Sequence, residues 1–234
     1  MSNATVVMIT GARGNLGAAV ARAYAATGAR LVLVDRQASD CEALAATLAV
    51  ESHCDGGDLG DPAAIDGIIT RAVARFGGID ALVHTVGGYA AGTPIHESSI
   101  DVLDQMYNLN VRPVFITAGR MAAHLVERGQ GGKIVVILAK AALKGQKNGG
   151  AYTASKAAAL RLIESMSLEL RDFQINVNGV LPSIIDTGRN REDMPNADFS
   201  KWVTPEQIAE TILFLTSSAA NAIHGASIEV YGRS

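Results

Sequence analysis

The sequence of 234 residues has little cysteine, and Cys41 and Cys54 do not form a CxxC motif. A disulfide scaffold or a cysteine-ligated metal site is therefore not expected. Both cysteines are expected to be reduced, buried thiols. No apolar run approaches the ~18 residues that a membrane-spanning helix needs. The start, MSNATVVMIT, lacks the basic and then apolar pattern of a signal peptide. We therefore expect a cytoplasmic protein that has no metal site and binds no membrane.

The sequence also has no excess of basic residues. Its 20 lysines and arginines and 23 aspartates and glutamates give a net charge of −3, and the basic residues form no run. Nucleic acids and anionic membranes are bound by basic surfaces, so neither partner is expected. Apolar residues make up 48% of the chain and charged residues 18%. This composition can form a sizeable core, and the length suits a single domain over residues 1–234.

Short, apolar, β-branched runs alternate with longer alanine-rich segments. Continuous apolar runs are typical of strands that are buried on both faces of a parallel sheet. The predicted strands are 5–10, 30–35, 81–85, 133–138, 175–181 and 227–231, with a weaker candidate at 49–54. The predicted helices lie near 16–27, 40–48, 61–76, 98–128, 151–171 and 204–217. This alternation predicts an α/β fold, a Rossmann-type doubly wound parallel sheet of about seven strands with helices on both faces.

A glycine-rich turn, TGARGNLG, follows the first predicted strand and contains Gly11, Gly14 and Gly17. Glycines allow the backbone to approach a pyrophosphate, and the free N–H groups of the following helix attract the anion. Asp35 ends the second predicted strand, where a carboxylate can bind the adenosine ribose hydroxyls. The sequence therefore predicts a dinucleotide site that prefers NAD, because Asp35 repels a 2′-phosphate.

Two arginines keep NADP open as a cofactor. Arg13 and Arg36 flank the predicted site, and each can either reach a 2′-phosphate or lie solvated at its rim. Asp58 follows the weak third strand and can either accept a hydrogen bond from the adenine amino group or begin a helix. The pair Asp61–Pro62 is the stronger signal for a helix start.

Tyr152 and Lys156 are four residues apart in a predicted helix, so their side chains share one face. An ammonium group beside a phenol favours the phenolate, so we expect Lys156 to lower the pKa of Tyr152 for acid–base chemistry. Long loops at 86–98 and 182–203 leave the carboxyl ends of strands, where open α/β sheets bind ligands. His84, at a strand end and without a visible partner, is interpreted as structural.

These motifs together resemble the short-chain dehydrogenase/reductases over essentially the whole chain. TGARGNLG, Asp35, Asp58, LVHTVGG, NLNVRPVF, YTASK and INVNGVLPSIIDT occur in the order and spacing of that family. The resemblance implies an NAD(P)H-dependent oxidoreductase that transfers a hydride to or from a small-molecule substrate and forms a homodimer or homotetramer. It assigns Tyr152 as the general acid/base and Lys156 as its partner. Asn110 is implied to hold a water molecule that forms part of a proton relay. The implied cofactor contacts are Gly11, Arg13, Asn15, Leu16, Gly17, Asp35, Arg36, Asp58, Leu59, Gly87, Tyr152, Lys156, Pro182, Ile184 and Thr187.

Three departures from the usual sequence of that family distinguish this chain. The glycine spacing is TGxxGxxG, the segment His84–Gly87 reads HTVG instead of NNAG, and Ala139 stands where a serine is expected. The adjacent Lys140 cannot replace that serine, because successive strand residues point to opposite faces. These features resemble the dihydropteridine reductase branch, as do the segment Gly87-Gly88-Tyr89 and the stretch MPNADFSKW at 194–202.

The branch resemblance suggests reduction of a pterin or quinonoid substrate. Tyr152 can protonate a ring nitrogen without help from a serine. Ala139, which takes the position of that serine, is expected to lie in the substrate site. Tyr89 is expected either to stack on a planar substrate or to pack against a substrate lid at about 184–203. Arg189 is expected either to bind a polar substrate or to lie on a solvated face of that lid. The alternative function is a nucleotide-binding scaffold or redox sensor with reduced catalysis.

Overall fold

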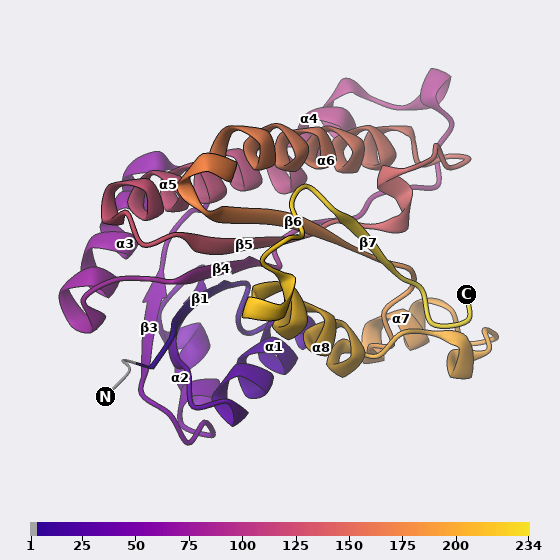
Figure 1. Ribbon diagram of the computed structural model, residues 1–234. Coiled ribbons are helices and arrows are strands. Elements are labelled where there is room, and N and C mark those ends of the chain that lie inside the picture. The colour runs from indigo at the N-terminus through magenta and orange to yellow at the C-terminus, as the bar shows by residue number, and fades with distance from the viewer. Residues whose placement is uncertain (1–3) are drawn as a thin grey trace.

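The computed structural model describes residues 4–234, which form one seven-stranded sheet with helices on both faces (Figure 1). The strand order is β3-β2-β1-β4-β5-β6-β7, and every neighbouring pair is parallel. The strands are β1 (Val6–Thr10), β2 (Arg30–Asp35), β3 (Ser52–Gly56), β4 (Ala81–His84), β5 (Gly132–Ile137), β6 (Ile175–Pro182) and β7 (Ser227–Val230). The order changes direction between β1 and β4, and open sheets of this kind bind ligands at the carboxyl ends of the strands beside such a point. The predicted fold is confirmed.

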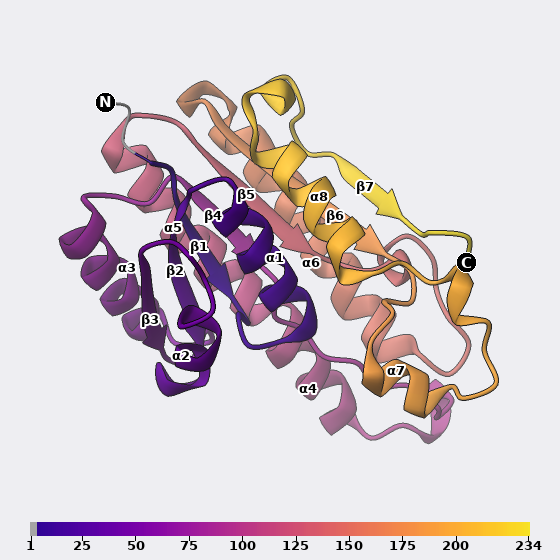
Figure 2. The same ribbon diagram turned by 90° about the horizontal axis from the view of Figure 1, so that it is seen from below.

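The helices form two layers. One face of the sheet is covered by α1 (Asn15–Ala26), α2 (Ser39–Ala45) and α8 (Pro205–Thr216), which Figure 2 shows from below. The other face carries α3 (Pro62–Phe76), α4 (Ile100–Asn110), α5 (Arg112–Arg128) and α6 (Gly150–Leu170) (Figure 1). None of the helices within residues 4–234 is both long and apolar enough to cross a membrane.

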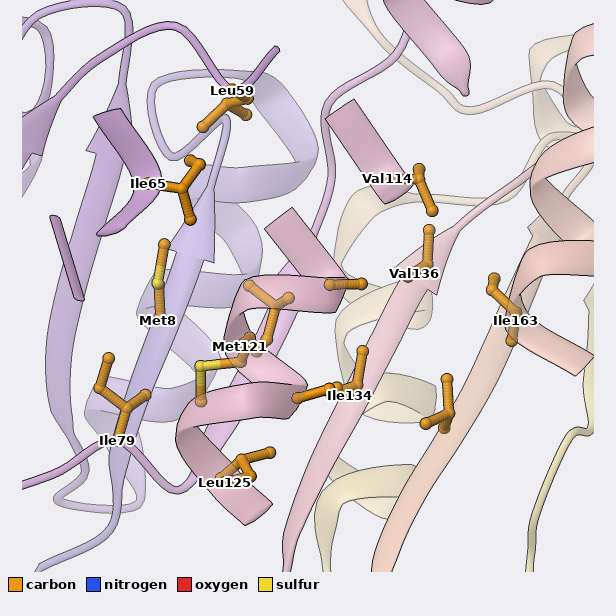
Figure 3. Close-up of a cluster of buried hydrophobic side chains, with 14 of the residues drawn as sticks. Met8, Leu59, Ile65, Ile79, Val114, Met121, Leu125, Ile134, Val136 and Ile163 are labelled. Carbon is orange, nitrogen blue, oxygen red and sulfur yellow. The ribbon is translucent and has the colours of Figure 1, made fainter. Parts of the chain in front are cut away.

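The core explains why the strands read as continuous apolar runs. Successive residues of a strand point to opposite faces, and both faces are covered. Met8 of β1 packs with Met121 of α5 and Ile134 of β5 in one buried cluster (Figure 3), whereas its neighbour Ile9 belongs to the cluster under α1 and α8. Because both clusters are closed to water, the strand ends are fixed and can position side chains at one edge of the sheet.

The helix predicted over 98–128 is wrong in one respect, because it is two helices. α4 ends at Asn110 and α5 begins at Arg112, with Val111 between them at φ −106° and ψ −56°. Pro113 lies in the first turn of α5, where its missing N–H group is tolerated, but a proline disrupts a helix that continues through it. The break leaves Asn110 at a helix end, buried against the site.

Two smaller differences concern loops and strands. The weak third strand lies at Ser52–Gly56 instead of 49–54, and the loop predicted over 182–203 contains the short helix α7 (Gly188–Asp193). Thr187 supplies the reason for that helix, since its hydroxyl accepts a hydrogen bond from the backbone N–H of Asn190 at 3.2 Å and caps the first turn.

Candidate active site

The glycine turn between β1 and α1 has the shape that a pyrophosphate requires. Gly11 has φ +70°, and a Cβ atom there would lie 2.7 Å from the hydroxyl oxygen of Thr85. A Cβ atom at Gly17 would collide with the carbonyl oxygen of Gly11. Helix α1 begins after Gly14 with no side-chain cap and no acidic residue in its first turn. Its first N–H groups can therefore receive an anion.

Asp35 lies beside this turn at the end of β2. Its two carboxylate oxygens accept hydrogen bonds from the backbone N–H groups of Arg13 at 3.1 Å and Arg36 at 3.0 Å. The guanidinium group of Arg13 is turned to Asp40 of α2, at 3.2 Å, and the Arg36 side chain is exposed. The Asp35 carboxylate thus lies beside the glycine turn, as the sequence predicts for a ribose-binding residue, and Arg13, one of the two candidate phosphate-binding arginines, already has a carboxylate partner.

Of the other predicted cofactor contacts, some can use their side chains and some only their backbone. The Asp58 carboxylate accepts the backbone N–H two residues later at 2.8 Å, and Asp61 caps α3, as its sequence predicts. Leu16 and Leu59 have buried side chains that belong to the two core clusters. Only their backbone can line a nucleotide site, whereas Asn15 is exposed at the first position of α1.

The predicted catalytic residues converge on the loop that follows β4. A Cβ atom at Gly87 would lie 2.8 Å from the Nζ atom of Lys156 and 2.9 Å from the Oδ1 atom of Asn110. Lys156 is buried and Tyr152 is half-buried, one turn earlier on α6. Ala139 follows β5, and the turn that it begins packs against α6. The fold therefore brings together residues from four separate parts of the sequence.

Asn110 connects the β4 loop to α6. Its Oδ1 atom accepts the Gly88 N–H at 2.8 Å, and its Nδ2 atom donates to the Gly88 carbonyl at 3.1 Å and to the Ser155 hydroxyl at 3.0 Å. Ser155 donates in turn to the Tyr152 carbonyl at 2.8 Å. The Asn110 side chain therefore holds the loop in place, and its role in holding a water molecule stays a prediction. Sequence reasoning missed Ser155, for which the only signal was its place within YTASK.

The pKa values of the catalytic pair differ from the sequence expectation. Burial raises the pKa of Tyr152 to about 12, and the neighbouring Tyr89 adds to this effect. Burial lowers the pKa of Lys156 to about 8. The expected lowering of the tyrosine pKa by Lys156 is thus wrong for this form of the protein, because the loss of water around the phenolate outweighs any attraction. At neutral pH the phenol carries its proton and can donate it.

His84 has a partner that the sequence did not reveal. Its side chain is 0% exposed, and its Nδ1 atom lies 3.0 Å from the hydroxyl oxygen of Thr10, the residue before the glycine turn. Burial, followed by the nearby charge of Lys156, lowers the pKa of His84 to about 3. The imidazole is therefore neutral at physiological pH and links the end of β1 to the end of β4.

An aromatic side chain borders Tyr152. The rings of Tyr89 and Tyr152 meet edge to face, with centroids 4.8 Å apart and an interplanar angle of 77°. Tyr89 is 64% exposed and is free to meet a substrate. A cavity of about 200 Å³ is lined by their chain neighbours Ala90 and Ala151 and, among others, by Thr93, Glu97, Ser99 and Asn148, but by neither tyrosine.

The predicted lid is folded back on itself. The Ile184 carbonyl accepts the Val203 N–H at 3.2 Å, and Trp202 is buried beside Phe199, with ring centroids 4.8 Å apart. The Arg189 side chain is 87% exposed and lies 3.7 Å from Asp193. This geometry favours the solvated-face interpretation of Arg189. Pro182 ends β6, where the lid begins.

The family profile described as short chain dehydrogenase matches residues 5–198. The chain belongs to the short-chain dehydrogenase/reductase family. D-threitol dehydrogenase of Mycolicibacterium smegmatis is 32% identical, with 97% of this chain and 91% of that protein aligned. L-rhamnose 1-dehydrogenase (NAD(P)(+)) of Azotobacter vinelandii is 31% identical, with 97% and 94% aligned. These relatives are named for sugars and polyols, so they support the family but not the resemblance to the dihydropteridine reductase branch.

Solved structures of short-chain dehydrogenases share the fold. The 3-ketoacyl-(acyl-carrier-protein) reductase from Brucella melitensis, complexed with NADH, matches with a TM-score of 0.87 at 25% identity over 97% of both chains. An NAD+-bound xylitol dehydrogenase matches with a TM-score of 0.91 over 99% of this chain and 100% of that chain, and its 23% identity supports the fold alone. As a member of this family, the protein is an oxidoreductase.

Burial of Lys156 predicts that this dehydrogenase is less stable at neutral pH than a variant without the charge. The pKa of Lys156 falls from the ordinary 10.5 to about 8 in the folded protein. The depressed value means that the folded state gains stability as the pH rises from about 8 to 10.5. Without cofactor, Lys156→Met should therefore raise the free energy of unfolding at pH 7 by up to about 3 kcal/mol, and the gain should shrink over that interval.

Denaturant unfolding at pH 7, 8.5 and 10 measures this effect. The matched control is Lys144→Met, because Lys144 is exposed and its substitution should change stability little at any of these pH values. A stability difference for Lys156→Met that stays constant from pH 7 to 10 would contradict the assignment.

Proposed function

We propose that this oxidoreductase uses NADH in preference to NADPH. Three features support this proposal. The glycine turn is too tight for a Cβ atom at Gly11 or Gly17, helix α1 begins without a side-chain cap, and the Asp35 carboxylate lies beside both. The nicotinamide of the bound cofactor supplies or accepts the hydride. In this proposal Lys156 holds the adjoining ribose, and Ile184 and Thr187 contact the carboxamide. The Thr187 hydroxyl also caps α7.

For the substrate we propose a planar, conjugated compound of the quinonoid or pterin type. The observation that carries this proposal is the exposed Tyr89 ring against Tyr152, in a site where Ala139 replaces a hydroxyl group. Ketone reduction builds negative charge on one oxygen and benefits from a second hydrogen-bond donor. A conjugated ring spreads this charge, so the proton of Tyr152 is sufficient.

Oxidation of a sugar or polyol is the second candidate. The names of the relatives favour it, and so does the cavity next to Ala151, whose lining includes Glu97, Ser99 and Asn148. Oxidation requires Tyr152 to act as a base, which its pKa of about 12 opposes. A catalytically reduced scaffold is the least supported candidate, because Tyr152, Lys156 and Asn110 are all present and assembled.

The lid and the assembly complete the proposal. Residues 184–203 leave the end of β6 beside the site, and we propose that they close over bound cofactor and substrate. Tyr107 on α4, Phe115 on α5 and Leu168 on α6 are exposed apolar side chains on neighbouring helices. Such surfaces support a homodimer or homotetramer.

Cofactor choice gives the first test. Asp35→Ala removes the charge that repels a 2′-phosphate, so the preference for NADH over NADPH should narrow by about ten-fold or invert. Dissociation constants for both cofactors, measured by fluorescence titration, check this. Asp66→Ala is the control, because Asp66 pairs with Arg120 on the α3–α5 surface, at 3.3 Å, and should leave the preference unchanged. Unmodified protein that binds NADPH as tightly as NADH would overturn the cofactor proposal.

Proton donation by Tyr152 gives the second test. Tyr152→Phe keeps the ring and removes the acidic proton, so turnover should fall about 10²-fold or more while NADH binding persists. The measurement is steady-state kinetics on a panel that contains a quinonoid dihydropterin, a quinone, simple ketones and polyols. Full activity of Tyr152→Phe toward every accepted substrate would show that the mechanism is wrong.

The missing hydroxyl gives the third test. Ala139→Ser adds a hydroxyl group that can donate a hydrogen bond to the oxygen of a simple ketone. Reduction of simple ketones should therefore improve, while reduction of quinonoid substrates should change little. Both substrate types are assayed side by side in the same variant. A gain that is equal for both types would mean that the substrate proposal has lost its basis.

A further inference from the structure

Two buried polar atoms on the α5 side of the sheet have no hydrogen-bond partner among the described residues. They are the Nε2 atom of His84 and the hydroxyl oxygen of Thr117, and both side chains are 0% exposed. A buried polar group without a partner costs about 1–3 kcal/mol, and proteins commonly satisfy such groups with an internal water molecule. The ring of His84 is otherwise fixed, because its Nδ1 atom is bonded to Thr10.

The two atoms enter the same interior layer. His84 is in phase with Leu82, which belongs to the core cluster beneath α5, so its ring points to that side of the sheet. His84 pairs with Val136 of β5, and Val136 lies next to Val114 of α5 (Figure 3). Thr117 follows Val114 by three residues and so lies on the same buried face of that helix.

Lys156 reaches the same layer from α6, which packs against α5. It is 6% exposed, and its ammonium group lies close to Gly87, three residues after His84. The charge of Lys156 is, after burial, the second cause of the lowered pKa of His84. Two uncharged polar side chains thus accompany the one buried ammonium group in this part of the core.

We propose that His84 and Thr117 hold an internal water molecule that accepts a hydrogen bond from Lys156 and positions its ammonium group from behind. The water donates to the Nε2 lone pair of His84, while the Nδ1–H of the same ring donates to Thr10. A water site needs two to four polar partners, and His84, Thr117 and Lys156 supply three. The proposal rests on the catalytic role of Lys156 given above and makes His84 a positioning residue.

This contact has a consequence for the lysine charge. A hydrogen bond to the ammonium group favours its protonated form, so the water opposes the effect of burial on the pKa of Lys156. Loss of the water should lower that pKa further. The neighbouring groups that titrate are His84 and the phenols of Tyr152 and, beyond it, Tyr89. His84, with a pKa of about 3, and Tyr152, with a pKa of about 12, both stay neutral from pH 6.5 to 9. Thr10, Asn110 and Thr117, on the other elements around the layer, do not titrate.

The test measures NADH affinity from pH 6.5 to 9, which requires no turnover, together with the pH profile of kcat/KM. In the unmodified protein both should decline above the Lys156 pKa of about 8. In His84→Leu and in Thr117→Val the decline should move about half a pH unit lower. NADH affinity should then fall about three-fold at pH 8.5 relative to the unmodified protein, and by less than about 1.5-fold at pH 6.5.

Two further variants separate positioning from stability. His84→Gln keeps a neutral hydrogen-bonding side chain and should restore most of the original profile. Ser167→Ala is the matched control, because Ser167 also has a buried hydroxyl without a partner on α6, but it faces Gly225. It should leave the profile in place. Thermal unfolding of each variant shows how much of any change is structural.

The outcomes are distinct. If His84→Leu and Thr117→Val lower thermal stability while both pH profiles superimpose on the original, the two residues are only structural and the proposal is overturned. A shift in His84→Leu alone would overturn the shared water site. If His84→Leu does not fold, the nearly isosteric Thr117→Val decides. Full turnover by Tyr152→Phe and Lys156→Ala would instead overturn the proposed function, and the pH dependence of NADH affinity would still test the water site.

Discussion

A buried ammonium group is the constraint on which the rest of the site depends. Lys156 of α6 is 6% exposed, and its Nζ atom lies close to Gly87 of the loop after β4. Glycine at position 87 lets the lysine approach the loop closely, because a Cβ atom there would lie 2.8 Å from the lysine nitrogen and would displace it. The loop after β4 must then be held at that distance, and Asn110 does so through two hydrogen bonds to Gly88. The break between α4 and α5 puts Asn110 where it can reach both the loop and α6.

The same exclusion of water sets the protonation states. A low-dielectric surrounding disfavours every charged form, so it raises the pKa of the tyrosine and lowers those of the lysine and of His84. The site thus contains a protonated phenol and a neutral imidazole around a lysine whose charge is lost a little above neutral pH. In this form of the protein Tyr152 carries the proton that the proposed reduction requires.

The fold could be predicted from the sequence because its signals are local. Runs such as RLVLVD have the composition of strands buried on both faces, and the carboxylate and proline of Asp61–Pro62 mark the start of α3. The site could be predicted only as a set of residues. The bond between Thr10 and His84 joins positions 74 residues apart, and the pKa of Tyr152 depends on burial that no short motif encodes. The break at Val111 was also missed, although Pro113 is its sequence signal.

Ala139 and the exposed Tyr89 support the proposed substrate together. A hydroxyl at position 139 would give a carbonyl oxygen a second donor and would fix that oxygen beside Tyr152. With alanine there, the side chain of residue 139 cannot donate a hydrogen bond, and recognition must come from shape and from contact with a ring. Tyr89 offers such a ring, 4.8 Å from that of Tyr152 and open to solvent. A flat substrate can be oriented by this ring, whereas a small ketone gains little from it. Under the substrate proposal, Tyr89 and Ala139 are therefore the two positions that set the specificity of this chain within its family.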